Sequence, residues 1–407
     1  MVTRMRIAFI ADGRAENFRR WAKFFVRNGD EVSVLSTYPC DPLEDSALFK
    51  LPGVIRASNT LVKRSDMQVQ SGQGSRFSQW IIEHGYDHTL YSTWSIVKTF
   101  DIWSQMWFAR RKLKEINPDI VVAFRTQNEG YVAGMTGFHP WILFTQGSDF
   151  VYMAERHAWH KFLTRGVVRK ADGLMSDCQR DINLARYYGF PQTHPARLFP
   201  GNGGVDLAVY RPGVAASDRK RWIVYPRGLA PYLRLDTFLS SINALQQEPD
   251  YSDVCYKLLV TPDVIPVALS MAYEQGLDMS RVEVLPFMSQ PDLSTLLQQA
   301  AVIVSPSLTD GTPNSMLEAM ACGAFPVMSN LESIQEWIHH GKNGLLFDPT
   351  QPSDLLNCLQ QALDNVALRS RAQLLNWQII KDRADYNLVM PALRQFLQNM
   401  VTKSANV

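Results

Sequence analysis

The sequence predicts an α/β protein with two domains, each built on a mainly parallel sheet covered by helices. Short apolar runs alternate with amphipathic stretches along the chain, which is the pattern of βαβ units. The length of 407 residues exceeds that of an ordinary single-core domain. A cluster of glycine and other turn-forming residues at 200–206 interrupts the pattern near the middle. We therefore predict domains over residues 1–205 and 206–385, followed by a C-terminal helical segment over 386–407.

In the first domain, apolar runs at 6–10 and 31–35 predict strands, and residues 17–28 predict a helix that ends at Gly29. The polar, glycine-rich residues 65–79 predict a loop. The alternation continues with a helix at 97–117, strands at 119–124 and 141–145, a helix at 152–170 and a strand at 172–176.

The second domain repeats the same alternation. Strands are expected at 221–225, 256–260, 281–285, 301–305, 325–328 and 344–347, and helices at 235–247, 264–276, 291–300 and 331–340 and from 352 onward. The final helix is expected at about 388–400.

The composition is that of a soluble globular enzyme, with 46% hydrophobic and 20% charged residues. No apolar run approaches the roughly 18 residues that a membrane-spanning helix needs. The first residues predict a short strand rather than a signal peptide. The five cysteines are scattered without metal-site spacing, which favours a reduced, cytoplasmic compartment.

The charge is divided unevenly along the chain. Residues 1–205 contain 26 Lys and Arg against 19 Asp and Glu, a net +7, whereas residues 206–407 contain 15 against 20, a net −5. A basic first half suits an anionic acceptor or an anionic membrane surface, and solvated helix faces explain it equally well. The basic, aromatic stretch 103–114 fits either a membrane-surface helix or a core-facing helix with a charged outer side. No nucleic-acid-binding motif is present.

Residues 306–324 are the most informative segment. A buried strand at 301–305 leads into a polar turn, and the turn opens a helix rich in Ala, Met and Leu. Free amides at a helix start, near Asn314, Ser315 and Met316, can hold anionic oxygens. Asp310 and Glu318 bracket the turn and can accept hydrogen bonds from hydroxyl groups. Phosphate and hydroxyl recognition together predict a nucleotide sugar as the ligand.

The run Asp310-Gly-Thr-Pro-Asn-Ser-Met-Leu-Glu318 resembles the acidic signature of retaining glycosyltransferases of family 4, in which two acids stand eight residues apart. Other segments in the same order resemble that family over residues 200–365: 199–212, 225–232 and 336–346. The resemblance implies a GT-B fold, with two Rossmann-like doubly wound domains facing a cleft and a C-terminal helix that crosses back to the first domain.

The resemblance also implies roles for residues in the second domain. Glu318 would bind the nucleotide ribose, and Asp310, where relatives usually have Glu, would contact the donor sugar. Gly311, Asn314, Ser315 and Met316 would complete the donor site. Helix capping and the preference of acids for helix starts are the alternative explanation of the two acids.

Arg227 is the expected partner of the donor diphosphate, because a guanidinium offers a planar fork to phosphate oxygens. The usual lysine of the family is replaced by Leu233. Its neighbour Arg234 is expected to be a surface residue at a helix start. Phe287 and Met288 are expected either near the nucleotide base or in the core.

In the first domain, Gly13 follows the first strand and would let the chain approach the donor pyrophosphate. Gln146 and Asp149 follow the strand at 141–145 and are the acceptor-side candidates, with helix capping as the alternative role of Asp149. Relatives often have His at the position of Gln146, and Gln cannot act as a base. His157 and His160 have no third ligand near them in sequence and are not expected to bind metal.

We therefore expect a retaining, metal-independent glycosyltransferase of polysaccharide or glycolipid biosynthesis, cytoplasmic or peripheral at the inner face of the membrane. Its co-substrate would be a nucleoside diphosphate sugar, with UDP as the expected nucleotide, and its acceptor a sugar or a lipid-linked sugar. It would need no other cofactor, and nucleic acid is not expected as a partner. The alternatives are a GT-B nucleotide-sugar epimerase, a GT-B sugar phosphorylase, or a non-catalytic subunit that binds a nucleotide sugar or a partner glycosyltransferase.

Overall fold

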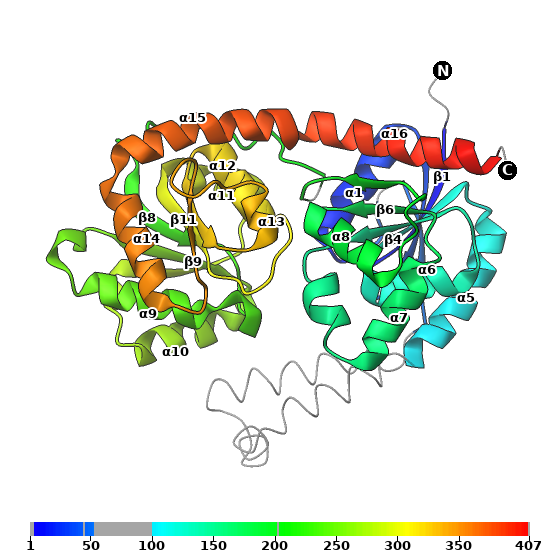
Figure 1. The fold of residues 1–407 in the computed structure, drawn as a ribbon, viewed down its shortest axis with the longest axis horizontal. Helices are drawn as coiled ribbons and strands as arrows, with labels where there is room; N and C mark the ends of the chain where they lie inside the picture. Colours follow the sequence, from blue (N-terminus) through cyan, green and yellow to red (C-terminus); the bar gives the residue numbers. More distant parts are fainter. Residues whose placement is uncertain (1–3, 44, 53–99, 202, 406–407) are drawn as a thin grey trace, which may run out of the picture. The chain divides into compact units, whose positions relative to one another are not determined.

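The structure, a computed structural model, describes residues 4–43, 45–52, 100–201 and 203–405. The chain divides into unit 1, formed by Met1–Gly203 with Leu388–Val407, and unit 2, formed by Gly204–Asn387 (Figure 1). The loop predicted at 65–79 lies outside the described residues. Among the described helices, none has the length and apolar character needed to cross a membrane.

Unit 1 contains a seven-stranded sheet in the order β3-β2-β1-β4-β5-β6-β7, and every neighbouring pair is parallel. Because all strands run the same way, the loops that follow them gather at one edge of the sheet. The strands are β1 (Arg6–Ala11), β2 (Glu31–Ser36), β3 (Ala47–Lys50), β4 (Ile120–Phe124), β5 (Trp141–Thr145), β6 (Gly173–Ser176) and β7 (Ala196–Leu198).

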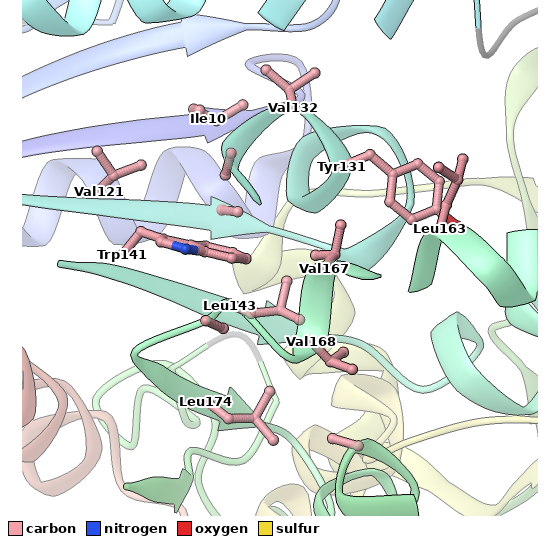
Figure 2. Packing of buried hydrophobic residues seen from close by; sticks show 14 of the residues in the cluster. Ile10, Val121, Tyr131, Val132, Trp141, Leu143, Leu163, Val167, Val168 and Leu174 are labelled. Carbon is pink, nitrogen blue, oxygen red and sulfur yellow. The ribbon is translucent and has the colours of Figure 1, made fainter. Parts of the chain in front are cut away.

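Helices cover both faces of the unit 1 sheet, so its central strands are buried on both sides and are apolar almost throughout. The helices are α1 (Glu16–Arg27), α5 (Phe100–Ile116), α6 (Tyr131–Thr136), α7 (Ala158–Val168), α8 (Gln179–Tyr188) and α16 (Tyr386–Ala405). Figure 2 shows the core on one face, where Tyr131 and Val132 of α6 and Val167 of α7 pack over strand residues such as Leu143.

The opposite face of this sheet is covered by α1 and α16. Trp21 of α1 packs against Phe124 and Phe144, with ring centroids 4.9 and 4.6 Å apart. Arg394 of α16 forms an ion pair at 2.7 Å with Asp30, and both side chains are almost completely buried. This buried pair ties the C-terminal helix to the turn that precedes β2.

Unit 2 contains a six-stranded sheet in the order β10-β9-β8-β11-β12-β13, again with every pair parallel. The chain builds outward from β8 to β10 and then returns to the other side of β8, so the strand order reverses between β8 and β11. The strands are β8 (Lys220–Tyr225), β9 (Cys255–Val260), β10 (Val282–Pro286), β11 (Ala300–Ser305), β12 (Phe325–Ser329) and β13 (Leu345–Phe347).

The helices of unit 2 are α9 (Leu235–Gln246), α10 (Ile265–Glu274), α11 (Gln290–Gln299), α12 (Asn314–Cys322), α13 (Glu332–Gln335), α14 (Pro352–Asp364) and α15 (Val366–Arg383). The end of α12 is held by Arg219, which is buried and donates to the carbonyls of Leu297, Ala300 and Cys322. A cation at these helix ends offsets the partial negative charge of their carbonyls. Burial still lowers the pKa of Arg219 to about 10.

The helix predicted at 152–170 is wrong in its first half. A π-helical turn (Asp149–Ala154) follows β5, and α7 begins only at Ala158, after the extended residue His157. Phe150 and Ala154 of this turn are buried, which holds the turn against the sheet instead of in line with α7. The two short strands β3 and β7 were not predicted, because three or four residues that are exposed or half-buried carry too little periodicity.

Candidate functional site

The candidate site in unit 2 lies at the carboxyl edge of β8 and β11, where the strand order reverses. Arg227 follows the end of β8 by two residues, and Asp310 follows the end of β11 by five. In open parallel sheets, ligands bind in the crevice that forms at such a reversal. We call this group the β8–β11 site: Arg227, Thr309, Asp310, Asn314, Ser315 and Glu318.

Arg227 and Asp310 form an ion pair between a terminal guanidinium nitrogen and Oδ2 of the carboxylate. The two side chains are 16% and 17% exposed, so the pair is mostly shielded from water. Asp310 Oδ1 also accepts a hydrogen bond from the Gly311 amide at 3.0 Å. Sequence reasoning named both residues for separate roles and did not predict that they pair.

The turn between β11 and α12 is held from the side of α13. The Ser333 hydroxyl donates to the carbonyl of Asp310 at 2.7 Å, and the Trp337 indole donates to Thr312 Oγ1 at 3.1 Å. These bonds fix the backbone that carries Asp310. The site is therefore preorganised on rigid elements rather than on a free loop.

The start of α12 corrects one prediction. The amides of Met316 and Leu317 both donate to the carbonyl of Pro313, at 3.1 and 3.2 Å, and the Met316 side chain is fully buried in the core. The Met316 amide is thus engaged within the first turn, so the prediction that it is free for a ligand is wrong. The Ser315 hydroxyl and the Thr309 hydroxyl are buried and have no hydrogen-bond partner among the described residues.

Glu318 lies on the same face of α12 as Asn314 and Ser315. From Asn314 to Cys322 these three residues are half-buried and the other six are buried. Positions i, i+1 and i+4 of a helix share one side, so the acid and the two polar side chains are presented together. The core contacts of the remaining residues determine this orientation.

The loop after β8 is held from within by the Tyr225 hydroxyl, which donates to the carbonyls of Gly228 and Leu233 at 3.1 and 3.2 Å. Burial raises the pKa of Tyr225, so the hydroxyl remains a donor. Gly228 has a φ of +72°, which only glycine adopts readily. In this loop Arg227 Nε is buried and has no acceptor within the described part of the chain.

Arg234 stands at a helix start, as expected, but its side chain is only 23% exposed. It precedes α9 and pairs at 2.9 Å with the exposed Asp236. Met288 packs against the unit 2 core, whereas Phe287 is 51% exposed. Of the two explanations for these residues, core packing holds for Met288 only.

In unit 1, Gly13 has a packing role. A Cβ at this position would lie 2.4 Å from Cys40 Sγ and 2.9 Å from Ser36 Oγ. The Gly13 amide already donates to Ser36 Oγ at 3.0 Å, and its carbonyl accepts from Arg19. The close approach that requires glycine is therefore to the chain after β2, and contact with a pyrophosphate stays a prediction.

Asp149 is buried completely, and neither predicted role fits its surroundings. Its Oδ2 accepts from the amides of Thr126 at 2.8 Å and Gln146 at 3.3 Å, and Arg125 Nε lies 3.7 Å from Oδ1. A side chain with no exposed surface cannot touch an acceptor hydroxyl in this conformation, and neither amide belongs to the helix after residue 152 that Asp149 was expected to cap. Asp149 instead ties the loop after β5 to the loop after β4. Burial raises the pKa of Asp149, and Arg125 opposes that shift.

Arg125 was missed by sequence reasoning. Its φ is +102° and that of Asn128 is +67°, conformations that cost non-glycine residues free energy and cluster at functional sites. The Arg125 side chain is 44% exposed, in contrast to Asp149 beneath it. The signal was the polar run 125–129 directly after a buried strand. We call Arg125, Thr126, Gln146, Ser148 and Asp149 the β4–β5 cluster.

Within the described part of the chain, His157 and His160 belong to no group of three potential metal ligands. His160 is buried, stacks on Tyr131 and has a pKa that burial lowers to about 4. Among the described residues, the group that could bring three ligand atoms together is Asp177, Cys178 and Asp181. Arg180 pairs with Asp181 at 2.7 Å, and burial raises the pKa of the Cys178 thiol, so the ligands that a cation needs are poorly available.

Comparisons with known proteins agree with this geometry. Residues 220–365 match a family described as glycosyl transferases group 1, and residues 65–178 match one described as glycosyl transferase 4-like. A D-inositol 3-phosphate glycosyltransferase from Nocardioides sp. is 26% identical over 244 residues, 52% of each chain. The serotype-specific mannosyltransferase WbdA from Escherichia coli is 32% identical over 108 residues, 26% of this chain and 13% of that protein. The matches thus span about half or less of these curated relatives.

Solved structures show the fold over nearly the whole chain. A sucrose-phosphate synthase from Thermosynechococcus elongatus has a TM-score of 0.74 at 15% identity, covering 98% of this chain and all of that one. HepE from Anabaena, in complex with UDP, has a TM-score of 0.68 at 13% identity, covering 97% of this chain and 100% of that one. The two parallel sheets therefore form a GT-B fold. The chain belongs to the group 1 glycosyltransferases of family 4.

Proposed function

We propose that this protein transfers a sugar from a nucleoside diphosphate sugar to an acceptor hydroxyl, with retention of the anomeric configuration and without a metal ion. The observation that carries the proposal is the β8–β11 site. Three features meet at the strand-order reversal: the shielded Arg227, the buried hydroxyls of Thr309 and Ser315, and the start of α12. Neither the Arg227 Nε nor the two hydroxyls have a hydrogen-bond partner among the residues that the structure describes. Two acids, Asp310 and Glu318, stand on the same segment to accept hydrogen bonds from sugar and ribose hydroxyls.

The proposed chemistry breaks the bond between the sugar C1 and the donor diphosphate and forms a bond from C1 to the acceptor oxygen. Negative charge develops on the leaving diphosphate. Arg227 and the positive end of α12 are the groups that would offset it, in the place that a metal ion takes in other enzymes. The acceptor proton passes to the leaving phosphate, which agrees with the engagement of Asp149 in unit 1 and with Gln at 146.

We propose UDP as the nucleotide. The support comes from HepE of Anabaena, whose structures contain UDP and UDP-glucose and share this fold. The shared fold does not name the sugar, and we leave the donor sugar to the screen described below.

For the acceptor, we propose a sugar in polysaccharide or glycolipid biosynthesis. The names of two relatives support a sugar or polyol hydroxyl: one is a serotype-specific mannosyltransferase and the other acts on D-inositol 3-phosphate. The net +7 of residues 1–205 also suits an acceptor that carries phosphate.

We also propose peripheral contact with the cytoplasmic face of a membrane through α5. Trp103 and Trp107, one turn apart, are 60% and 64% exposed, and the exposed Arg110, Arg111 and Lys114 follow them. Exposed tryptophans beside cations are typical of membrane-surface helices.

Sedimentation with vesicles containing phosphatidylglycerol tests the membrane contact. The vesicles should capture the protein, and W103A/W107A should reduce capture. Tyr273→Ala, at a 65% exposed aromatic of unit 2, is the matched control and should not reduce it.

The proposed transfer is tested first by binding. Thermal unfolding is measured with a panel of nucleoside diphosphates and nucleotide sugars, and UDP-linked donors should raise the melting temperature. Glu318→Ala should abolish that rise, whereas Glu274→Ala, at an exposed acid of α10, should keep it. Full stabilisation of the Glu318→Ala variant would overturn the site.

Turnover then separates the candidate functions. The best donor is incubated with candidate acceptors, and nucleotide release and the anomeric configuration of the product are measured. Binding without release of the nucleotide would support the non-catalytic subunit. An altered sugar on an intact nucleotide would support the epimerase.

A further inference from the structure

We propose that Asp310 is a positioning residue for Arg227, and that the diphosphate of the donor must displace it. The inference rests on the proposed function and deepens it. One terminal nitrogen of Arg227 is bound to Asp310 Oδ2. Asp310, which is expected to bind the donor sugar, is therefore bound to Arg227, which is expected to bind the diphosphate.

Both carboxylate oxygens of Asp310 are occupied from within the protein. Oδ2 accepts from Arg227, and Oδ1 accepts from the Gly311 amide. The side chains are only 16% and 17% exposed, so little water competes for them. Sugar hydroxyls can engage Oδ2 fully only if Arg227 gives up part of its hold on that oxygen.

Arg227 has capacity for an exchange of partners. Its Nε is buried and finds no acceptor in the described part of the chain, although a guanidinium is strongest when it binds two oxygens side by side. A diphosphate brings several acceptor oxygens and more negative charge than one carboxylate. It would satisfy Nε and a terminal nitrogen together, in the forked geometry that phosphate favours.

Because Arg227 exchanges Asp310 for the diphosphate, binding of the donor diphosphate and binding of the donor sugar depend on each other. UDP alone takes Arg227 and leaves the Asp310 carboxylate without its cation, in a place with little solvent. The intact nucleotide sugar also supplies hydroxyls to Asp310 and so offsets that loss. The pair therefore favours the intact donor over the free nucleotide, and after transfer Asp310 competes with UDP for Arg227 and promotes its release.

The test is a double-mutant cycle on UDP affinity, measured by calorimetry with Asp310→Asn, Arg227→Gln and the double variant. Asn keeps the size of Asp and an oxygen for the Gly311 amide. Asp310→Asn should bind UDP about tenfold more tightly than the wild type, a gain of about 1.4 kcal/mol. In the Arg227→Gln background, the same substitution should change UDP affinity by less than about twofold, because the competition for Arg227 is gone.

Three controls make the result specific. Uridine, which has no phosphate, should bind the wild type and Asp310→Asn equally. Asp253→Asn removes a carboxylate from another arginine pair, with Arg221 at the start of β8, and should leave UDP affinity unchanged. An intact UDP-sugar should gain less affinity than UDP from Asp310→Asn, because the sugar loses an acceptor.

Two outcomes would overturn the inference while UDP binding persists. An equal gain from Asp310→Asn with and without Arg227 would show general charge repulsion rather than competition. An unchanged or weaker UDP affinity of Asp310→Asn would show that the pair does not oppose the nucleotide. If the wild type binds no nucleoside diphosphate at all, the proposed function fails as well, so the two failures are distinguishable.

Discussion

Each of the two sheets carries an arginine–aspartate pair at the edge where its strands end. The two pairs differ in how far the carboxylate is exposed to water. In unit 2, Arg227 pairs with Asp310, and both side chains keep some exposure. In unit 1, Arg125 lies beside Asp149, and the carboxylate has none. In both, the two residues follow neighbouring parallel strands.

The comparison teaches that an acid after a parallel strand is not by itself a ligand site. Asp149 Oδ2 accepts from two backbone amides and so joins two loops, and its Oδ1 lies 3.7 Å from Arg125 Nε. Asp310 uses one oxygen for its own turn and the other for Arg227, which we propose that the donor diphosphate takes from it. Burial and the kind of partner, rather than residue type or position, separate a structural carboxylate from a binding one.

The largest expected effect is on turnover at the unit 2 pair. Arg227→Gln should lower the rate of donor cleavage about 10²- to 10³-fold, or about 3–4 kcal/mol, because a preorganised donor to the leaving group is lost. The measurement is nucleotide release under saturating donor, with the melting temperature as a check on folding. A rate within about threefold of the wild type would mean that the site lies elsewhere.

The next effect should be on stability at the unit 1 pair. Asp149→Ala leaves the Thr126 and Gln146 amides without their acceptor, and it should lower the free energy of unfolding by about 3 kcal/mol. Urea denaturation measures this directly. Asp310→Ala is the matched variant and should cost less, about 1–2 kcal/mol, because its side chain keeps some exposure and it leaves one backbone amide, that of Gly311, without its acceptor rather than two. Equal losses at the two positions would break the comparison.

A smaller effect is expected on the pH dependence of stability, through the buried His160 of unit 1. Burial lowers the pKa of His160 to about 4, below its unfolded value of 6.5. A depressed histidine pKa stabilises the fold above pH 6.5, and this stability is lost as the pH falls through 4. The wild type should therefore lose about 2 kcal/mol of unfolding free energy over that window relative to His160→Gln. Parallel pH profiles of the two proteins would show that His160 is open to solvent.

The last comparison concerns two glycines of unit 1. Gly13→Ala should destabilise the protein by about 1–3 kcal/mol, because the new Cβ would collide with Cys40 and Ser36. Gly166→Ala is the matched control. It lies within α7, where a Cβ meets nothing within 4 Å, and should stabilise by up to about 1 kcal/mol. Thermal unfolding of both variants checks the pair, and a neutral Gly13→Ala would remove the packing role.

The fold class was predictable from the sequence because apolar periodicity is a local signal. The strands at 120–124 and 141–145 are buried on both faces and appear as continuous apolar runs. The edge strands Ala47–Lys50 and Ala196–Leu198 were missed because exposed and half-buried residues in short runs carry no such pattern. The break between Ala154 and Ala158 was missed because contacts with distant segments, such as the stacking of Phe150 on Tyr188 of α8, are not visible in local propensity.

For the candidate sites, the sequence by itself determined those features that depend only on local geometry within one helix or one turn. Asn314, Ser315 and Glu318 share a face because helical geometry places them there, and the apolar residues between them select the buried side. Only the tertiary structure determined which charged side chains form ion pairs and which remain exposed to water. Arg227 and Asp310 are 83 residues apart, and Asp149 is 23 residues from the amide of Thr126 that it binds. Such pairs and their burial depend on strand order and on packing between distant segments, and neither is written in the local pattern of residues.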